Sequence, residues 1–105
     1  MTKYKAIKTN GYASKKEAKR AAELKMFEKA GLISGLQEQV KYPLIPSRKR
    51  LDGRTEHGCV YIADFTYCLP DGFPVVEDVK GVKTDAYIIK RKLMLFIHDI
   101  EILET

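Results

Sequence analysis

The chain has 105 residues, of which 45% are hydrophobic and 31% charged, and its formal net charge is +5 at pH 7. That length suits one compact domain, and the apolar content excludes a chain that is disordered throughout. No apolar run reaches the roughly 18 residues that cross a bilayer, and the amino-terminal segment lacks the apolar centre of a secretion signal, so a cytoplasmic protein without membrane contact is expected.

The first predicted element is a helix that follows a basic lead-in. Residues 1–13 are polar and basic and are expected to form an irregular arm. Ser14 and Glu17 have the spacing of a capping box and Gly31 is a stop signal, so a helix is predicted over about residues 14–30. One stripe of this helix, with residues three and four apart, is expected to face the sheet: Glu17, Ala21, Leu24 and Glu28.

Three strands are predicted in the middle of the chain. The first covers residues 36–45, where polar and apolar side chains alternate and Pro43 indicates a sheet edge or a bulge. The second and third cover 59–68 and 73–80, which are rich in β-branched and aromatic residues. Residues 46–58 contain turn-forming and basic side chains with almost nothing to bury, so an exposed and mobile basic loop is expected there.

A second helix and a final strand complete the predicted fold. Thr84 can cap a helix that runs to about residue 97. One face of this helix carries Ile89, Leu93 and Phe96. Residues 98–104 then form a short strand, parallel to its partner because it arrives through a helical crossover. The order α-β-β-β-α-β predicts a single α/β domain over residues 1–105, with a mixed sheet flanked by helices.

The turn between the second and third strands decides which acidic side chains meet. The loop Pro70-Asp71-Gly72 fits a three-residue hairpin connection with glycine in the left-handed position, and that register sets Asp64 opposite Asp78. A two-residue loop would instead pair Asp64 with Glu77. The three-residue interpretation is preferred, and alternation along the strand then places Lys80 on the same face as Asp78.

Two opposed carboxylates and a lysine form a candidate metal centre. Directly opposed strand residues have Cβ atoms about 4.5–5.5 Å apart, where two bare carboxylates repel each other and a divalent cation reverses the repulsion. The oxygens of Asp64 and Asp78, the main-chain carbonyl of Val79 and waters suit Mg²⁺, with Mn²⁺ as a substitute. Such an ion can hold a phosphate and activate water beside the charge of Lys80, which predicts phosphodiester hydrolysis.

The same residues resemble a known group of enzymes. Asp64, followed fourteen residues later by Asp78-x-Lys80, with Glu17 upstream on a helix, resembles the PD-(D/E)xK nuclease superfamily, whose fold is restriction-endonuclease-like. Ala63 stands where the superfamily's name has a proline. The segments SKKEA, QVKYPLIP, YIADF and VVEDVKGVKT also resemble a phage and prophage family catalogued as a domain of unknown function, over nearly the whole chain.

This resemblance implies a role for each member of the motif. Asp64 and Asp78 would ligate the metal, and Lys80 would orient or activate the attacking water. Glu17 would assist a metal, although it also has a structural explanation as the N3 partner of its own helix cap, so both roles stay open. Gln39 on the first strand matches a glutamine common in related nucleases.

The charge distribution favours a nucleic-acid partner. Residues 1–20 contain seven Lys or Arg and one acid, whereas residues 55–79 contain five acids and no Lys or Arg. A basic exterior around an acidic centre suits a polyanion held at the rim. Nine residues are candidates for contacting DNA: Lys15, Lys16, Gln39, Arg48, Lys49, Arg50, Arg54, Thr84 and Lys90.

The sequence therefore predicts a Mg²⁺-dependent DNA endonuclease, encoded by a phage or prophage and active in the bacterial cytoplasm. The resemblance implies a role in recombination, repair or genome processing, with branched DNA such as a Holliday junction as a candidate substrate and a homodimer as a candidate assembly. The alternative is a nucleic-acid-binding accessory protein that has the fold without turnover. A basic adaptor for an acidic protein partner is a weaker third hypothesis.

Overall fold

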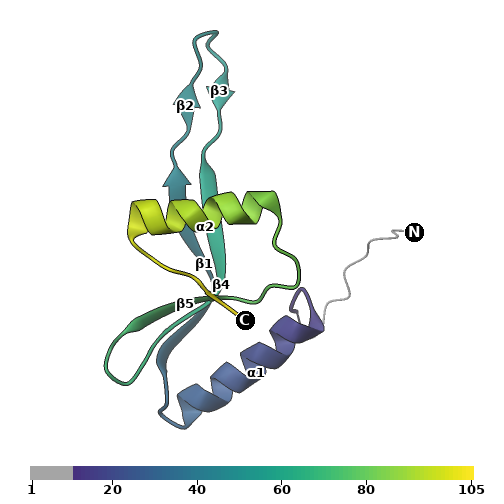
Figure 1. Ribbon diagram of the computed structural model, residues 1–105, viewed down its shortest axis with the longest axis vertical. Helices are drawn as coiled ribbons and strands as arrows, with labels where there is room; N and C mark the ends of the chain where they lie inside the picture. The colour runs from purple at the N-terminus through teal and green to yellow at the C-terminus, as the bar shows by residue number, and fades with distance from the viewer. Residues whose placement is uncertain (1–10) are drawn as a thin grey trace, which may run out of the picture.

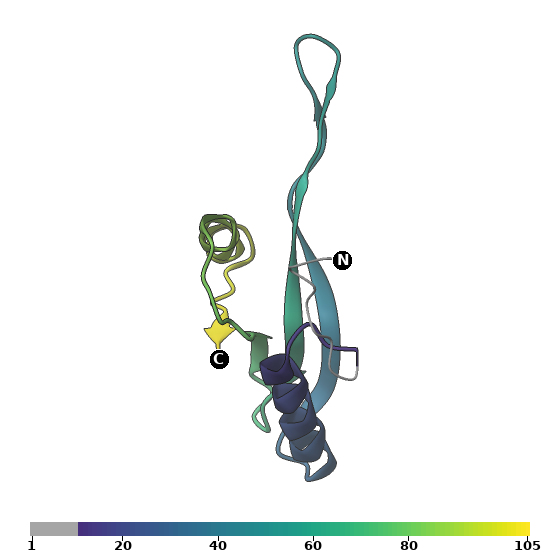
Figure 2. The same cartoon turned by 90° about the vertical axis from the view of Figure 1, so that its right-hand side faces the viewer.

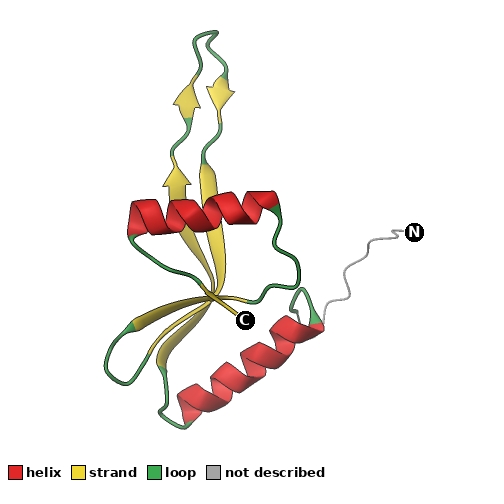
Figure 3. Cartoon of the chain, viewed as in Figure 1, coloured by secondary structure: helices red, strands yellow, loops and turns green. Residues whose placement is uncertain are grey.

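The computed structural model describes residues 11–105, so most of the predicted amino-terminal lead-in over residues 1–13 lies outside the described residues. Its elements are the helices α1 (Lys15–Lys29) and α2 (Asp85–His98) and the strands β1 (Ser34–Ile45), β2 (Arg48–Lys49), β3 (Thr55–Glu56), β4 (Cys59–Cys68), β5 (Pro74–Asp78) and β6 (Leu103–Glu104) (Figures 1 and 3). The α/β class and the predicted order of elements are confirmed, with one additional hairpin. None of the helices described is long and apolar enough to cross a membrane.

The main sheet has four strands in the order β1-β4-β5-β6. The β1–β4 and β4–β5 pairs are antiparallel, whereas β5 and β6 are parallel, with Glu77 opposite Leu103 and Asp78 opposite Glu104. The predicted parallel last strand and the mixed sheet are therefore confirmed. β1 forms one edge of this sheet, and its register shifts just after Pro43, as expected for a proline that cannot donate to the ladder.

Helix α1 begins and ends where its capping residues predict. The Ser14 hydroxyl accepts a hydrogen bond from the Glu17 amide at 3.1 Å, and Gly31, just past the helix, has a left-handed φ of 78°. Three of the four residues on the predicted stripe are buried: Glu17, Ala21 and Leu24. The fourth, Glu28, is exposed and accepts a hydrogen bond from the Leu36 amide at 2.9 Å.

Helix α2 packs through a face that shares only Leu93 with the predicted stripe, since Leu93 is partly buried against the core cluster. Tyr87 and Met94 are its buried residues, whereas Phe96 is 86% exposed and Ile89 is 57% exposed. The helix is apolar on most of its circumference, so periodicity alone offers more than one apolar stripe. The contacts of Tyr87 with its neighbours in the fold decide which stripe faces inward.

Two hydrophobic clusters lie along the ribbon formed by β1 and β4. One packs against α1 and contains Ala21, Leu24, Ile33, Phe65 and Tyr67. The other packs against α2 and contains Leu44, Tyr61, Ala63, Val76, Tyr87, Met94 and Ile102. Figure 2 shows the ribbon from its edge, with α2 beside its middle and α1 at its lower end.

Alternate residues of β4 contribute to both clusters, because the ribbon twists between them. Residues 61 and 63 pack with α2, whereas residues 65 and 67, on the same side by alternation, pack with α1. Asp64 lies at this changeover. Opposite it on β1, Gln39 has a φ of 54°, a left-handed conformation that is uncommon for a residue other than glycine.

The predicted exposed loop over residues 46–58 is a hairpin, so the loop prediction was wrong in this respect. Strands β2 and β3 pair antiparallel and continue the β1–β4 ribbon away from the body (Figure 1). Every residue from Ile45 to His57 is exposed, as predicted. The hairpin escaped prediction because neither of its faces is buried, so it lacks the alternation of apolar and polar residues that marks a strand.

Strand β5 ends at Asp78, two residues earlier than predicted. Beyond that point the Val79 amide donates to Oδ2 of Asp64 at 2.8 Å instead of to a main-chain carbonyl of β4. The Lys80 amide still bonds the carbonyl of Thr105 at 3.0 Å, next to β6. A carboxylate has thus replaced the ladder acceptor, and the chain leaves the sheet at the candidate site.

Candidate active site

The register of the β4–β5 hairpin brings two aspartates together. The Leu69 amide bonds the Phe73 carbonyl at 2.9 Å, and Gly72 has a φ of 89°, so the connection is the predicted three-residue loop. Phe65 pairs with Glu77, and the same register continued by one residue sets Asp64 opposite Asp78. The preferred interpretation is confirmed, and the pairing of Asp64 with Glu77 is excluded.

Asp64 is half-buried and has hydrogen-bond donors on both oxygens. Oδ2 accepts from the Val79 amide at 2.8 Å, and Oδ1 accepts from Nε2 of Gln39 at 3.4 Å. Burial and the adjacent Asp78 carboxyl raise the pKa of Asp64 to about 7, although the Val79 amide opposes the shift. The raised pKa reflects two carboxyl groups placed close together in a partly buried site.

Asp78 is almost fully buried, and its surroundings are aromatic and basic. Its side chain is 3% exposed, and Oδ2 accepts a hydrogen bond from the Tyr61 hydroxyl at 2.6 Å. Nζ of Lys80 lies 3.3 Å from the same oxygen and 4.1 Å from the centroid of the Tyr87 ring. The ion pair and the cation–π contact hold the ammonium group beside the carboxylate. Lys80 thus reaches Asp78 as predicted, although it lies beyond the end of the strand.

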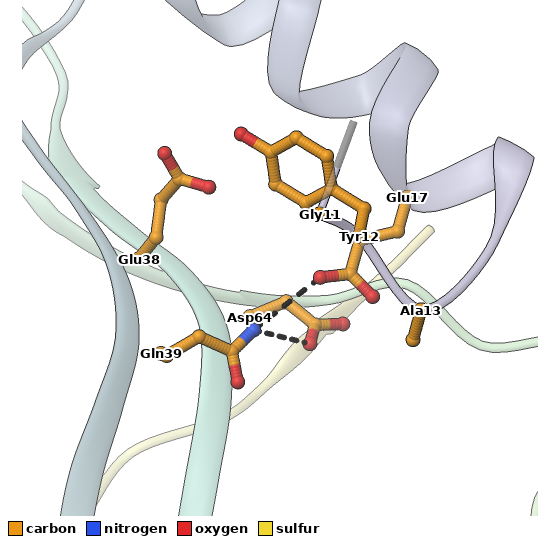
Figure 4. A pocket seen from close by; sticks show the side chains of 7 residues that line it. All are labelled: Gly11, Tyr12, Ala13, Glu17, Glu38, Gln39 and Asp64. Carbon is orange, nitrogen blue, oxygen red and sulfur yellow. Dashed lines mark hydrogen bonds between the residues drawn. The ribbon is translucent and has the colours of Figure 1, made fainter. Parts of the chain in front are cut away.

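Glu17 enters the site from the first turn of α1. Its side chain is 7% exposed, and Oε2 accepts a hydrogen bond from Nε2 of Gln39 at 3.3 Å. Burial, followed by the charges of Asp78 and Glu38, raises the pKa of Glu17. The helix cap uses the main-chain amide of Glu17, so its carboxylate is free to turn inward. Figure 4 shows the Gln39 amide between the carboxylates of Glu17 and Asp64.

The two aspartates open onto neighbouring hollows of the surface. The larger, of about 540 Å³, is lined by Tyr12, Glu17, Glu38, Gln39 and Asp64 together with two small residues (Figure 4). The other, of about 270 Å³, is lined by Tyr61, Asp78, Lys80, Thr84, Tyr87 and Lys90 among others. A ligand at the centre would therefore meet carboxylates on one side and two lysines on the other.

Residues 1–101 of the chain match the model of a protein family that is described as a protein of unknown function (DUF1064). The chain belongs to the DUF1064 family. A comparison with curated proteins and one with solved structures gave no match.

The predicted DNA-contacting residues of this DUF1064 protein fall into two groups. Near the carboxylates, Nζ of Lys16 donates to the Lys80 carbonyl at 3.0 Å, Lys90 lines the smaller hollow, and Thr84 caps α2 by accepting from the Tyr87 amide at 3.2 Å. Lys15 is exposed in the first turn of α1, and Gln39 bridges two carboxylates. The second group is not brought to the site, because it lies on the β2–β3 hairpin: Arg48, Lys49, Arg50 and Arg54.

Sequence reasoning missed a buried ion pair behind the site of the DUF1064 protein. Glu77 is fully buried, and its carboxylate accepts from Nε of Arg20 at 2.6 Å, Nη2 of Arg20 at 3.1 Å, the Tyr67 hydroxyl at 2.6 Å and the Thr105 hydroxyl at 3.0 Å. Burial alone would raise the pKa of Glu77, but these donors hold it below its usual value. The network joins α1, β4, β5 and the chain end behind Asp78.

Two tyrosines near the site were missed as well. Tyr61 donates to Asp78, and Tyr87 lies under Lys80 while its hydroxyl donates to Glu104 at 2.6 Å. The apolar pattern presents both tyrosines as core residues, which they are, with side chains 3% and 6% exposed. A buried tyrosine hydroxyl needs a partner, and that rule is the only signal that pointed to the acids.

The oxygen donors of the site suit a hard divalent cation. Among residues 11–105, no group of three or more His, Cys, Asp or Glu side chains is arranged to hold a metal ion. The candidate ligands are therefore the Asp64 and Asp78 carboxylates with the main-chain carbonyl of Val79. Mg²⁺ is commonly bound through one or two carboxylates while it keeps several waters, so this donor set fits Mg²⁺ or Mn²⁺.

Proposed function

We propose that this protein is a Mg²⁺-dependent endonuclease that hydrolyses phosphodiester bonds in DNA, with a PD-(D/E)xK-type site. One observation carries the proposal: Asp64 and Asp78 oppose each other on adjacent strands, with Nζ of Lys80 3.3 Å from Asp78. Opposed acids repel, and Lys80 supplies a single positive charge beside two carboxylates, so folding stability alone does not explain the pair. A divalent cation bound between the two carboxylates would explain it, because its charge offsets their repulsion.

Each residue of the site has a task in the proposed reaction. Asp64 and Asp78, with the Val79 carbonyl, would hold Mg²⁺ or Mn²⁺, which when bound polarises a phosphate oxygen and lowers the pKa of water. Tyr61 donates to one oxygen of Asp78 and so orients the carboxylate. Lys80, held over the Tyr87 ring, places a fixed positive charge where a phosphate or the attacking water can receive its hydrogen bonds.

Glu17 and Gln39 support the same centre from α1 and β1. Nε2 of Gln39 lies 3.3 Å from Glu17 and 3.4 Å from Asp64, so its amide ties the two carboxylates together. Gln39 holds this position in a left-handed conformation, and backbone strain of this kind is concentrated at functional sites. Held beside Asp64 in this way, the Glu17 carboxylate would accept hydrogen bonds from waters bound to the metal.

The topology and the charge support the nuclease proposal. A helix, an antiparallel run of strands, a second helix and a parallel last strand follow one another in the order that the sequence predicts, and this order supports the proposal of a restriction-endonuclease-like fold. The net charge of +5 and the exposed lysines near the site suit a polyanionic substrate. We place the activity in phage recombination, repair or genome processing in the bacterial cytoplasm, with branched DNA and a homodimeric enzyme to be tested first.

A nucleic-acid-binding accessory protein without turnover is the second candidate. One observation favours it: within residues 11–105 the carboxylates do not form a cage of three or more metal ligands. In that case the site would hold its ion weakly, and the basic surface would act alone.

A cleavage panel tests the nuclease proposal. Linear, nicked, flapped and four-way DNA are incubated with Mg²⁺, Mn²⁺ or a chelator. Asp78→Asn and Lys80→Ala are each expected to lower cleavage by roughly 100-fold or more while DNA binding is retained. Glu101→Gln and Lys92→Ala, both at exposed positions, serve as matched controls and should cut like the unchanged chain. A chain that binds DNA but cuts none of it with either metal would support the accessory protein instead.

A further inference from the structure

The β2–β3 hairpin, residues 46–58, projects from the body of the protein and is called the arm below (Figure 1). Its residues Arg48 and Lys49 pair with Glu56 and Thr55. An isolated two-stranded hairpin is marginally stable in water, and this one has no buried residue to support it. Packing within the protein therefore does not stabilise the hairpin, and a bound partner could.

The two faces of the arm differ in charge. The Arg50 amide bonds the Arg54 carbonyl at 2.7 Å, so these two residues oppose each other in the register that pairs Arg48 with Glu56. Because side chains alternate along a strand, one face of the arm carries three arginines and a single acid. This arginine face consists of Arg48, Arg50, Arg54 and Glu56. The opposite face carries Lys49 and Thr55.

Repulsion between the charges of the arginine face destabilises the hairpin. Like charges directly across a strand pair are destabilising, and Arg50 opposes Arg54. Two of the three arginines have an acidic partner on the arm, with Nε of Arg54 2.9 Å from Asp52 and Nε of Arg50 3.7 Å from Glu56. All four side chains are exposed, so these pairs contribute little to stability. A polyanion laid along this face would relieve the repulsion between the arginines.

The base of the arm is built to set its direction. The Gly58 amide donates to the Ser47 hydroxyl at 3.1 Å, which links the two sides of the base. A Cβ atom at Gly58 would collide with the Ile45 carbonyl oxygen, so glycine permits a close approach of the two strands here. The arm therefore leaves the sheet along a path that these backbone contacts define.

The distance from the arm to the carboxylates corresponds to a turn of DNA. Glu56 precedes Asp64 by eight residues and Arg54 precedes it by ten, and most of this segment is strand. At about 3.3 Å per residue, the separation is at most roughly 26–33 Å. B-DNA rises about 3.4 Å per base pair, so this length spans roughly 8–10 base pairs, close to one helical turn. After one turn a DNA strand returns to the same side of the duplex.

We propose that the arginine face of the arm binds the phosphate backbone of a DNA duplex about one helical turn from the phosphate at Asp64 and Asp78. The inference rests on the proposed function, because it takes the carboxylates as the cutting site. The arm then measures duplex on one side of the cut, and a substrate too short to reach it binds only at the body of the protein.

The salt dependence of binding tests the arginine face without any cleavage. Affinity for a 30-base-pair duplex is measured in chelator over a range of salt concentrations. Arg50→Gln combined with Arg54→Gln is expected to reduce the slope of log affinity against log salt by about 2, since each phosphate contact contributes about 0.9. Lys29→Gln combined with Lys92→Gln removes two exposed lysines of the helices, outside the arm, and is the matched control that should leave the slope unchanged. An unchanged slope in the double variant, or an equal change in the control, would overturn the proposal.

Substrate length tests the spacing. With duplex trimmed from one side of the mapped cut, the unchanged chain should lose affinity once fewer than about 8 base pairs remain. The double arginine variant should be insensitive to the same trimming, and a loss equal to that of the unchanged chain would contradict the arm contact. Failure of the two proposals is distinguishable, because a chain that cuts no DNA but shows the arginine effect refutes the nuclease proposal alone. A chain that cuts DNA with no arginine effect refutes the arm alone.

Discussion

Two hairpins in this protein close through the same three-residue loop and yet lie in opposite surroundings. In the arm the loop is Leu51-Asp52-Gly53, and between β4 and β5 it is Pro70-Asp71-Gly72. The glycine amide bonds the carbonyl three residues earlier at 3.0 Å in the arm and 2.8 Å in the β4–β5 hairpin, and the glycines have φ values of 87° and 89°. In each loop the aspartate also accepts from the amide two residues later.

The comparison separates what a turn decides from what packing decides. The loop sets the register of both hairpins, and thereby opposes Arg50 to Arg54 in one and Asp64 to Asp78 in the other. Helices cover the β4–β5 hairpin and bury its acids, whereas the arm meets only solvent. Local chemistry thus places two like charges face to face in each hairpin. Their sign determines that the aspartates suit a cation and the arginines a polyanion, whereas packing determines that the first pair lies in the body of the protein and the second on its exposed arm.

The largest expected difference between the two hairpins concerns their ion pairs. Glu77→Ala removes the buried partner of Arg20 and should lower the free energy of unfolding by about 3–5 kcal/mol, because it leaves donors unpaired in the core. Glu56→Ala removes the exposed partner of Arg50 in the arm and should change the free energy of unfolding by less than about 1 kcal/mol. Urea unfolding followed by circular dichroism measures both. Similar shifts for the two variants would contradict the distinction between packed and exposed hairpins.

A smaller difference is expected from the loop glycines. Alanine at either glycine must adopt a left-handed conformation, which costs about 1–2 kcal/mol. Gly72→Ala should lower global stability by that amount, since its hairpin belongs to the core. Gly53→Ala should leave the melting temperature nearly unchanged and only increase amide hydrogen exchange in the arm. Equal melting temperatures for both variants would show that the arm unfolds together with the body.

The smallest expected effect is the pH dependence contributed by Glu104, on the strand that pairs with β5. Hydrogen bonds from Tyr87, Arg91 and Lys83 lower the pKa of Glu104 to about 2. A lowered pKa in the folded state gives stability that is present above the unfolded value near 4.5 and is lost as the pH falls toward 2.

Stability measured from pH 6 to 2.5 checks this effect. Glu104→Gln should flatten the decline below pH 4.5 by on the order of 1 kcal/mol, after allowance for solvent screening at a partly exposed site. Glu101→Gln, at an exposed position nearby, is the matched control. A decline of equal steepness in the Glu104 variant and the unchanged chain would remove this network as its cause.

Prediction from sequence succeeded where the cause of a structure is local. The cap of α1 at Ser14 and that of α2 at Thr84 form because a hydroxyl lies three residues before an amide that it can bind. The meeting of Asp64 and Asp78 follows from the loop between their strands, so it too could be worked out from a few adjacent residues. The arm carried the same loop signal at Asp52-Gly53, but its flanking residues have no apolar alternation.

Prediction failed where several solutions satisfy the same local pattern. Helix α2 is apolar around most of its surface, so only contact with the sheet could select Tyr87 and Met94 as its buried residues. Glu77 and Arg20 are 57 residues apart, and nothing in either local sequence indicates that they pair. The hydrogen bond from Tyr61 to Asp78 depends in the same way on the twist of the sheet.

The sequence by itself determined the caps, the turns and the strand register, because each depends on backbone geometry within a few residues. Only the tertiary structure decided which side of each element is buried, which donors meet Asp78 and Glu77, and that the exposed basic segment stands out as an arm. These outcomes depend on contacts between distant parts of the chain, whose free energies come from burial and from the satisfaction of buried polar groups.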